Sequence, residues 1–293
     1  MAAADLVNRV LARAGLELHR AGWVPDDTRL YREVYGEDAV RERRFYNIGA
    51  GRFAHACWTN VDLQSDWYAH DQGGGVGIDW DLMACTPLPI ADGTAELIYT
   101  SHTVEHVTNE ADANLFAEAH RVLRPGGILR VTTPNIWLSY RAYRDRDRSF
   151  WYWADAHSPD GEWQRLKHTM PMNTWSLQQL LVYDFATNAA AVHADGASDP
   201  LSDAEVDQLF GDLPLEDALD ACLARCSLEV HRRNPQDHIN WWTWPKMERM
   251  LRAAGFTDVR LSGYLQSHAP VLRQKAFFDT RFPPISLYVE ATR

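Results

Sequence analysis

The sequence predicts an α/β fold in which helices cover a mainly parallel sheet and an insertion interrupts the core. Between residues 44 and 135, short apolar segments of strand length alternate with a helical pattern. The alternation disappears after Trp137 and resumes from Trp244 to the end of the sequence at Arg293. The first apolar segment also ends in a glycine turn, Gly49 to Gly51, which is typical of the first strand in a ligand-binding α/β sheet.

Each expected strand is a short apolar segment that ends at a turn residue or at an acid. These strands are 45–48, 58–63, 76–82, 95–100, 128–133, 259–264 and 286–291. Apolar residues at helical spacing predict helices at 3–21, 28–35, 109–123, 176–185, 203–226 and 244–254. We expect Pro125-Gly126-Gly127 to stop the helix before the fifth strand and Gly255 to cap the last helix.

Length and composition narrow the class of protein. The 293 residues suit one core of ordinary size with an insertion. Hydrophobic residues make up 46% and charged residues 24%, which is typical of a soluble globular protein and excludes a disordered chain. The net charge of −11 disfavours nucleic acid as a partner, because an acidic chain repels phosphate. The apolar stretches are far shorter than the ~20 residues of a membrane-spanning helix, so no membrane partner is expected.

The N-terminal segment and the cysteines indicate a cytoplasmic protein without a structural metal. Residues 1–20 lack the unbroken hydrophobic region of a secretory signal peptide. The four cysteines form no C-x-x-C pair, which predicts reduced thiols and no structural zinc. No H-E-x-x-H pattern is present, and no metal is predicted. The cysteines are Cys57, Cys85, Cys222 and Cys226.

Two acids at strand ends suggest a nucleoside-like ligand. Asp62 follows the glycine turn far sooner than the roughly 20 residues typical of a dinucleotide fold, and the third glycine of that fingerprint is missing, so NAD is disfavoured. Asp62 suits two ribose hydroxyls, although a helix N-cap is the alternative. Asp81 suits an adenine amino group, with Leu82 and Met83 against the ring, and Asp79 is its rival on the same strand face.

As an ordered series, these segments resemble the class I S-adenosylmethionine-dependent methyltransferases, and among them the small-molecule group with a type 11-like methyltransferase domain. The resemblance covers roughly Arg44 to Asn135 and, more loosely, Trp244 to Arg293. It implies a Rossmann-like sheet of seven strands whose last strand, 286–291, runs antiparallel beside 259–264. The segments that carry it are YNIGAG, NVDL, DLMACTPLP, AELIYTSHTVEHV and RVLRPGGILRVTTPN.

The resemblance implies S-adenosylmethionine as cofactor and S-adenosylhomocysteine as product. The glycine turn would lie under the methionine and ribose, Asp62 would hold the ribose, and Asp81 the adenine. Ser101 and His102, at the tip of the fourth strand, would face the sulfonium and the acceptor. The full set of expected cofactor contacts is Asn47, Gly49, Ala50, Gly51, Asp62, Leu63, Asp81, Leu82, Met83, Ser101 and His102.

Three histidines are candidates for the catalytic step. Methyl transfer is an in-line displacement that depends on positioning, and a hydroxyl acceptor also needs a base. His238 and His102 rank first because both are expected at the mouth of the cleft, and His106 follows. Each has the alternative of a structural histidine, and Glu105 and His106 together have the alternative of buttressing the loop. The run 141–148, RAYRDRDR, is interpreted as a solvated helix face, with a clamp for an anionic acceptor as the alternative.

These inferences divide the chain into N-terminal helices (1–43), a methyltransferase core (44–136 and 244–293) and a mainly helical insertion or lid (137–243). The expected function is O-methylation of a sugar or specialised metabolite, and a homodimer is possible. The competing functions are N-methylation of a small metabolite, methylation of a protein, and a regulatory protein that binds the cofactor without turnover. Eight of the 12 tryptophans lie from Trp137 to Trp244, in the insertion or directly after it, as core anchors or as a wall for the acceptor.

Overall fold

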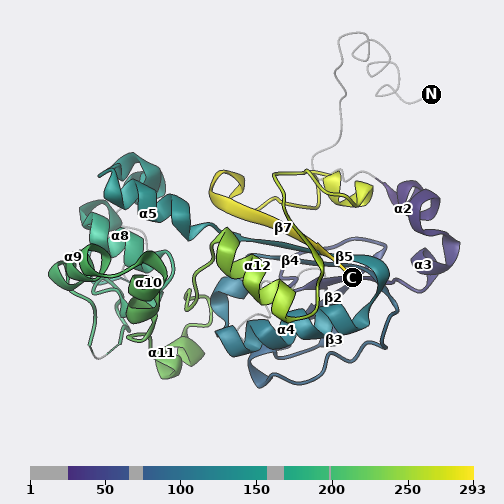
Figure 1. The fold of residues 1–293 in the computed structure, drawn as a ribbon, viewed down its shortest axis with the longest axis horizontal. Coiled ribbons are helices and arrows are strands. Elements are labelled where there is room, and N and C mark those ends of the chain that lie inside the picture. Colours follow the sequence, from purple (N-terminus) through teal and green to yellow (C-terminus); the bar gives the residue numbers. More distant parts are fainter. Residues whose placement is uncertain (1–25, 66–74, 157–167, 198) are drawn as a thin grey trace, which may run out of the picture.

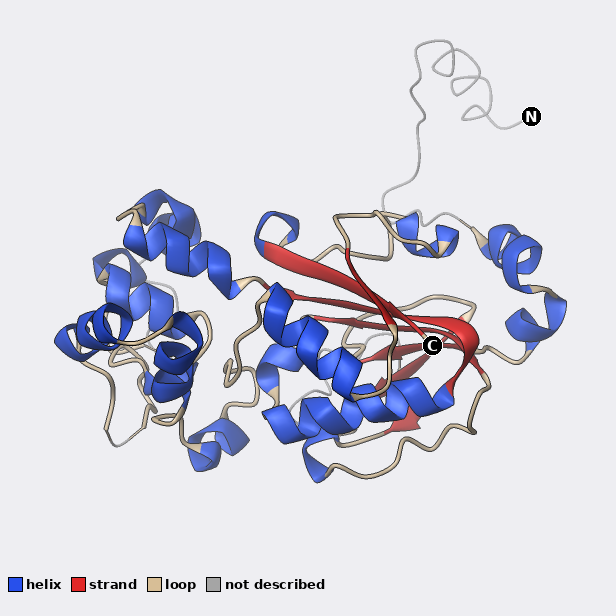
Figure 2. Ribbon diagram, viewed as in Figure 1, coloured by secondary structure: helices blue, strands red, loops and turns tan. Residues whose placement is uncertain are grey.

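The computed structural model describes residues 26–65, 75–156, 168–197 and 199–293. The helix expected over 3–21 lies outside the described residues. A twisted sheet forms one half of the molecule and a helical lobe lies beside it (Figures 1 and 2). Within the described residues, no helix has the length and apolar character that a membrane crossing requires.

The sheet has seven strands in the order β3-β2-β1-β4-β5-β7-β6. The first five are joined by parallel pairings. Strand β7 is antiparallel to both β5 and β6, as the resemblance implies, and the predicted fold class is confirmed. The strands are β1 (Phe45–Ile48), β2 (Trp58–Asp62), β3 (Ile78–Asp79), β4 (Ala95–Ser101), β5 (Leu123–Pro134), β6 (Asp258–Leu261) and β7 (Ser286–Thr292).

Three predicted strand boundaries are wrong. Strand β3 covers only Ile78–Asp79, because the chain leaves the edge of the sheet and turns into a 3₁₀ helix that Asp81 caps. Strand β5 starts at Leu123, so the Pro125-Gly126-Gly127 turn lies inside the strand and the preceding helix already ends at Val122. A register shift against β4 absorbs this irregular segment. Strand β6 ends at Leu261, three residues before its expected end.

Helices pack on both faces of the sheet. Helices α4 (Asn109–Val122) and α12 (Trp244–Ala253) lie side by side over one face, where Phe116 and Leu251 are fully buried (Figure 1). Helices α2 (Thr28–Tyr35) and α3 (Glu37–Arg41) belong to a second apolar cluster, in which Tyr31 packs on Phe45 and accepts a hydrogen bond from Trp58 Nε1 at 2.6 Å. The 3₁₀ helices are η2 (Leu82–Ala84), η3 (Val104–His106), η4 (Arg148–Trp151), η5 (Met172–Thr174), η6 (Thr187–Ala189), η7 (Pro270–Arg273) and η8 (Pro283–Ile285).

The helical lobe has an apolar core of its own, at the left of Figure 1. The helix expected over 203–226 is two helices, because Pro214 cannot continue α9 and instead begins α10. Trp151, Trp175 and Trp241 are buried in this core, which favours the anchoring role for these tryptophans. The helices of the lobe are α5 (Ile136–Arg144), α6 (Tyr152–Ala156), α8 (Leu177–Tyr183), α9 (Asp203–Asp212), α10 (Leu215–Leu223) and α11 (Leu228–Arg233).

Candidate active site

A cavity of about 1760 Å³ lies at the carboxyl ends of β1, β2 and β4 and extends to the helical lobe. Open α/β sheets bind their ligands at this edge, where strand order reverses about β1 and β4. Every site residue expected from the sequence lines this cavity. They are Asn47, Gly49, Ala50, Gly51, Asp62, Leu63, Asp81, Leu82, Met83, Ser101, His102, His106 and His238.

The glycine turn after β1 is fixed by a neighbouring loop. Gly49 has a φ of +67°, and a Cβ at this position would lie 2.2 Å from Thr103 Oγ1. The absent side chain therefore makes room for Thr103, whereas the glycine pattern alone had indicated the approach of a ligand. Gly51 has a φ of +52° and donates its backbone N–H to Asp62 Oδ2 at 2.8 Å. The turn thus aligns two strand ends, β1 and β2, against the loop after β4.

Asp62 is held by backbone hydrogen bonds and can accept further hydrogen bonds. Its Oδ1 accepts from the backbone N–H of Leu63 at 2.8 Å, and its Oδ2 accepts from Gly51. A carboxylate has about four acceptor sites, so ribose hydroxyls can still donate to it. Burial raises the pKa of Asp62 above its ordinary value, although backbone N–H groups oppose the shift. The residue fits the ribose role in position and chemistry.

The structure separates the two acids near β3. Asp81 lies on the cavity wall beside Leu82, and its Oδ1 accepts from the backbone N–H of Met83 at 2.9 Å. Asp79 Oδ1 instead accepts from the backbone N–H of Gln64 at 2.8 Å, and Asp79 is absent from the described cavity lining. The position of Asp81 at the start of a 3₁₀ helix, rather than in a strand, turns it toward the cavity.

His102 occupies a strained position at the tip of β4. Its φ is +53°, which is uncommon for a side chain other than glycine and clusters at functional sites. Its Nε2 lies 2.9 Å from Ser286 Oγ and its Nδ1 lies 3.1 Å from Glu105 Oε1. Because both ring nitrogens contact protein groups, His102 is better placed to orient Glu105 than to take a proton from an acceptor. Nearby, Ser101 Oγ accepts from Thr132 Oγ1 at 2.7 Å.

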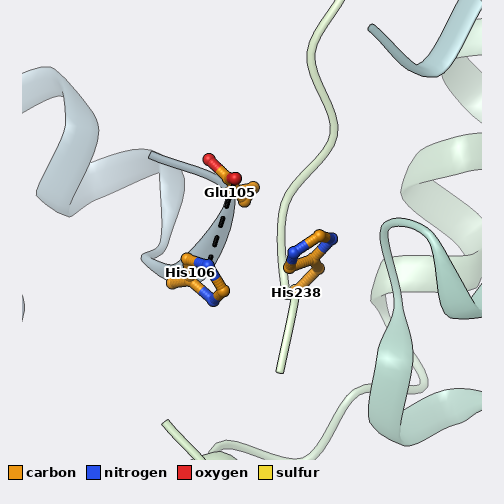
Figure 3. A group of neighbouring side chains, drawn as sticks. All are labelled: Glu105, His106 and His238. Carbon is orange, nitrogen blue, oxygen red and sulfur yellow. Dashed lines mark ion pairs between the residues drawn. The ribbon is translucent and has the colours of Figure 1, made fainter. Parts of the chain in front are cut away.

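Glu105, His106 and His238 form a cluster where the sheet meets the lobe (Figure 3). The rings of His106 and His238 meet edge to face with centroids 4.7 Å apart, and His106 Nε2 lies 4.0 Å from Glu105 Oε1. Burial, together with the charge of His238, lowers the pKa of His106 to about 4, so its ring is neutral at pH 7. Burial opposes ionisation of Glu105, but its contacts with His102, His106 and His238 bring its pKa down to about 2.

The lobe holds His238 against the sheet. His238 Nδ1 lies 2.6 Å from the backbone oxygen of Asp184, and its backbone N–H donates to Thr187 Oγ1 at 3.0 Å. One residue later, the backbone N–H of Ile239 donates to the backbone oxygen of Glu105 at 2.9 Å. These bonds bring a residue from the segment after the lobe beside two residues from the loop after β4.

The sequence predicts a lid or a wall from the insertion but does not identify most of the residues that line the cavity. This wall is apolar and aromatic on one side, and the arginines of the run 141–148 are absent from the described lining. Arg148 instead donates to the backbone oxygen of Asn173 at 2.9 Å, and Arg144 donates to the hydroxyl of Tyr140 at 2.7 Å. Periodicity places such residues in a core but cannot show which of them face a cavity. The residues that segment 137–243 contributes to the lining are Ser139, Trp153, Met172, Tyr183, Asp184, Thr187, Leu228, His231, Arg232, Pro235, Gln236, Asp237 and His238.

Comparisons with known proteins match part of the chain to one family. Residues 48–131 match the family described as "Methyltransferase domain". No curated protein matches the chain. A methyltransferase structure from Mesorhizobium loti is 15% identical, covers 85% of this chain and 90% of its own, and has a TM-score of 0.39. A possible histamine N-methyltransferase from Thermotoga maritima is 12% identical, covers 85% of this chain and 81% of its own, and has a TM-score of 0.38. A methyltransferase from Archaeoglobus fulgidus is also 12% identical, covers 92% of this chain and 100% of its own, and has a TM-score of 0.38.

The family match and the strand order with its antiparallel β7 define the class of the matched segment, which is a class I S-adenosylmethionine-dependent methyltransferase domain. More narrowly, its residues 48–131 are a methyltransferase domain of the matched family. This segment runs from Ile48 to Val131 and contains the glycine turn, Asp62, Asp81 and the loop after β4.

Proposed function

We propose that the protein transfers a methyl group from S-adenosylmethionine to a hydroxyl of a small molecule, with a sugar or a specialised metabolite as the preferred class. The observation that carries this proposal is a cavity of about 1760 Å³ that runs from the glycine turn to the helical lobe, with His238 between them. Ligand pockets commonly measure about 300–1,000 Å³, so this one has room for a cofactor and an acceptor together.

The sheet half of the cavity would hold the cofactor. Asp62 would accept from the ribose hydroxyls, Asp81 from the adenine amino group, and Leu82 and Met83 would contact the ring. When bound there, S-adenosylmethionine supplies an electrophilic methyl group, whose bonding electron pair stays with the departing sulfur. The chain's task is then to hold the acceptor oxygen in line with that methyl group and to keep it free of its proton.

The lobe half of the cavity would hold the acceptor. Trp153, Tyr183, Met172 and Leu228 offer flat and apolar surface to a sugar face or an aromatic ring. His238 and His106 lie at the junction of the two halves, where they would activate the acceptor hydroxyl, and His102 would orient Glu105 behind them. We therefore propose residues 137–243 as the acceptor-side lid on a core of 44–136 and 244–293.

The proposal also includes the cellular compartment and a ranking of the competing acceptors. We propose a cytoplasmic enzyme, on the strength of its free thiols at Cys57, Cys85, Cys222 and Cys226. N-methylation of a small metabolite ranks second, because the same cavity serves an amine acceptor. Methylation of a protein ranks third, and a regulatory role without turnover ranks last.

The experiment that tests this proposal is incubation of the protein with methyl-labelled S-adenosylmethionine and a cell extract. The extract is first separated into macromolecules and small molecules. Transfer of label to a small molecule whose product contains a methyl ether supports the proposal, and mass spectrometry identifies the acceptor. Label on nitrogen selects N-methylation, and label on protein selects protein methylation. Binding of S-adenosylhomocysteine with no labelled product in either fraction favours the regulatory role.

A further inference from the structure

The cluster of Glu105, His106 and His238 has the composition of a metal site. One potential ligand atom from each side chain lies within 4.8 Å of those from the other two. Glu105 and His106 belong to η3, whereas His238 comes from the segment that follows the lobe, and all three side chains converge in Figure 3. The cluster is part of the cavity wall, so an ion bound here would be reachable from the acceptor side.

Both imidazoles are oriented by backbone oxygens. His106 Nδ1 lies 3.3 Å from the oxygen of Asp237, and His238 Nδ1 lies 2.6 Å from the oxygen of Asp184. A ring nitrogen that faces a carbonyl must donate, which leaves the lone pair of the neutral ring on Nε2. Histidines that bind metals are typically held in this way, with the second nitrogen donating to a carbonyl or a carboxylate.

Glu105 brings a buried oxygen that is poorly satisfied. Its side chain is 2% exposed, and its Oε2 accepts from Thr133 Oγ1 at 3.0 Å. Oε1 lies 3.1 Å from His102 Nδ1, but no hydrogen bond of favourable geometry reaches it from the residues that the structure describes. Buried oxygens of this kind are rare in folded proteins, and an absent ion is one explanation for them.

We propose that Glu105, His106 and His238 bind a divalent transition-metal ion, zinc being the best match, through Oε1 and the two Nε2 atoms. Two imidazoles and one carboxylate are a common set in catalytic zinc sites, which keep one position open. This inference rests on the proposed function only for the occupant of that position, the acceptor hydroxyl, whose proton the ion would make easier to remove.

The geometry allows the site to close on an ion. Zinc bonds to nitrogen and oxygen are about 2.0–2.2 Å, so tetrahedral ligands lie roughly 3.3 Å apart. Rotation of the side chains must therefore bring the present atoms closer together. His238 and His106 are only partly buried and border the cavity, while Glu105 is held by its hydrogen bond from Thr133. The sequence pattern predicted no metal because His238 lies far along the chain from Glu105 and His106.

The test is a titration of the full-length protein with Zn²⁺ by calorimetry, after removal of resident metal with a chelator. We expect a single ion per chain, and expect His106→Gln and His238→Gln each to weaken its affinity by more than about 100-fold, since even residues behind the ligands are worth 10–100-fold. Co²⁺ in place of Zn²⁺ adds a spectroscopic readout, because its visible absorption reports the number of ligands. Affinity for S-adenosylhomocysteine and the melting temperature, measured on the same samples, show that each variant is folded.

Two control variants test whether zinc binds through other side chains. Cys85 is exposed and lines the same cavity, so Cys85→Ser tests whether a thiol holds the zinc. His268 is exposed and contacts Arg260, so His268→Gln tests for surface binding. Both should bind zinc as the unaltered chain does. The inference is overturned if the unaltered chain binds no zinc, if His106→Gln and His238→Gln bind it normally, or if Cys85→Ser abolishes it. Because zinc binding is measured without turnover, its failure is distinct from a failure of methyl transfer.

Discussion

At the scale of single residues, Asp62 carries the cofactor assignment. Its two carboxylate oxygens accept from the backbone N–H groups of Gly51 and Leu63, and the residue lines the cavity. Asp79 is the natural comparison, since it also accepts from a backbone N–H, that of Gln64, but is absent from the described lining. Asp62 is therefore the proposed ligand contact, and Asp79 serves as its structural comparison.

Asp62→Asn should weaken S-adenosylhomocysteine binding by about 2 kcal/mol, roughly 30-fold in Kd, because hydrogen bonds to a charged acceptor are lost. Asp79→Asn should leave the Kd unchanged. Calorimetry on both variants and the unaltered chain measures the difference. Equal losses in the two variants would mean that Asp62 acts only through the fold.

Asp62 also predicts how binding depends on pH. Burial raises its pKa in the free protein, whereas ribose hydroxyls donate more strongly to the ionised form. As pH falls through this raised pKa, the carboxyl gains a proton and loses acceptor capacity. Affinity for S-adenosylhomocysteine should therefore decline on the acid side, beginning at a higher pH than an ordinary aspartate would give. The slope should vanish in Asp62→Asn, and its persistence there would assign it to another group.

His238→Gln should lower turnover strongly while leaving S-adenosylhomocysteine affinity intact. General acid–base groups typically contribute about 10²–10⁴-fold, and the loss should fall in that range with the true acceptor. His268→Gln, on the exposed side chain beside Arg260, is the matched control and should turn over normally. Initial rates at saturating cofactor measure both, and normal turnover in His238→Gln would remove this residue from the catalytic group.

At the scale of elements, the contact between the glycine turn and the loop after β4 sets the position of the site. Gly49→Ala would place a Cβ 2.2 Å from Thr103 Oγ1 in addition to the strain of a φ of +67°. We expect a loss of more than about 2 kcal/mol in stability, together with weaker cofactor binding as η3 moves. Denaturant unfolding measures the stability change.

Gly93→Ala is the control for Gly49→Ala. Its φ is +66°, almost the same, yet the nearest atom to an added Cβ lies 3.6 Å away on Arg293. Gly93→Ala should lower the free energy of unfolding only by the strain of the left-handed region, about 1–2 kcal/mol, and should leave cofactor binding unchanged. Thr103→Ala combined with Gly49→Ala should recover part of the loss. Identical effects of the two glycine substitutions would refute the contact as the reason for Gly49.

The sequence predicts the central elements of the sheet well and its edges poorly. β1, β2, β4 and β7 are rich in apolar and β-branched residues and are buried at most positions, so the pattern and the structure coincide. β3 is an edge strand with a single partner, and pairing ends after Asp79 although the apolar pattern continues to Leu82. The sequence does not predict the start of β5, because Pro125-Gly126-Gly127 is typical of a turn. The pairing of β5 with β4 and β7 depends on residues that are distant in the sequence.

The same division holds for the site. The cofactor half follows from short motifs in one stretch of chain, because the carboxyl ends of neighbouring parallel strands meet at one edge. The acceptor half depends on how the lobe packs, and nothing local in the sequence brings His238 to His106 or Trp153 to the cavity. The sequence suggests only a supporting role in the loop for Glu105, since its hydrogen bond from Thr133 is a long-range consequence of the fold.

At the scale of the whole molecule, a buried polar network joins the lobe to the core. Lys246, on α12, donates to Asn240 Oδ1 at 2.6 Å and to the backbone oxygen of Trp241 at 3.0 Å. Asn240 in turn donates to Asp112 Oδ2 on α4 at 2.9 Å. The ammonium also lies 4.0 Å from the centre of the Trp241 ring. Burial lowers the pKa of Lys246 to about 8. This value is still above neutral pH, so the ammonium group keeps its charge at pH 7.

Lys246→Met should destabilise the protein by about 3 kcal/mol, because it leaves buried acceptors unpaired next to Asp112. Lys275→Met, at an exposed position, should change stability very little. Urea unfolding of both variants at pH 7 measures the difference. Equal stability of the two variants would show that the network contributes nothing to the junction between lobe and core.

The central claim is that this cavity binds S-adenosylmethionine at the carboxyl ends of β1, β2 and β4. Calorimetric titration of the full-length protein with S-adenosylhomocysteine tests it most directly, because the product binds without turnover and without knowledge of the acceptor. We predict saturable binding at a single site per chain, and no measurable heat with NAD. Absence of binding at saturating S-adenosylhomocysteine, or tighter binding of NAD, would contradict the claim.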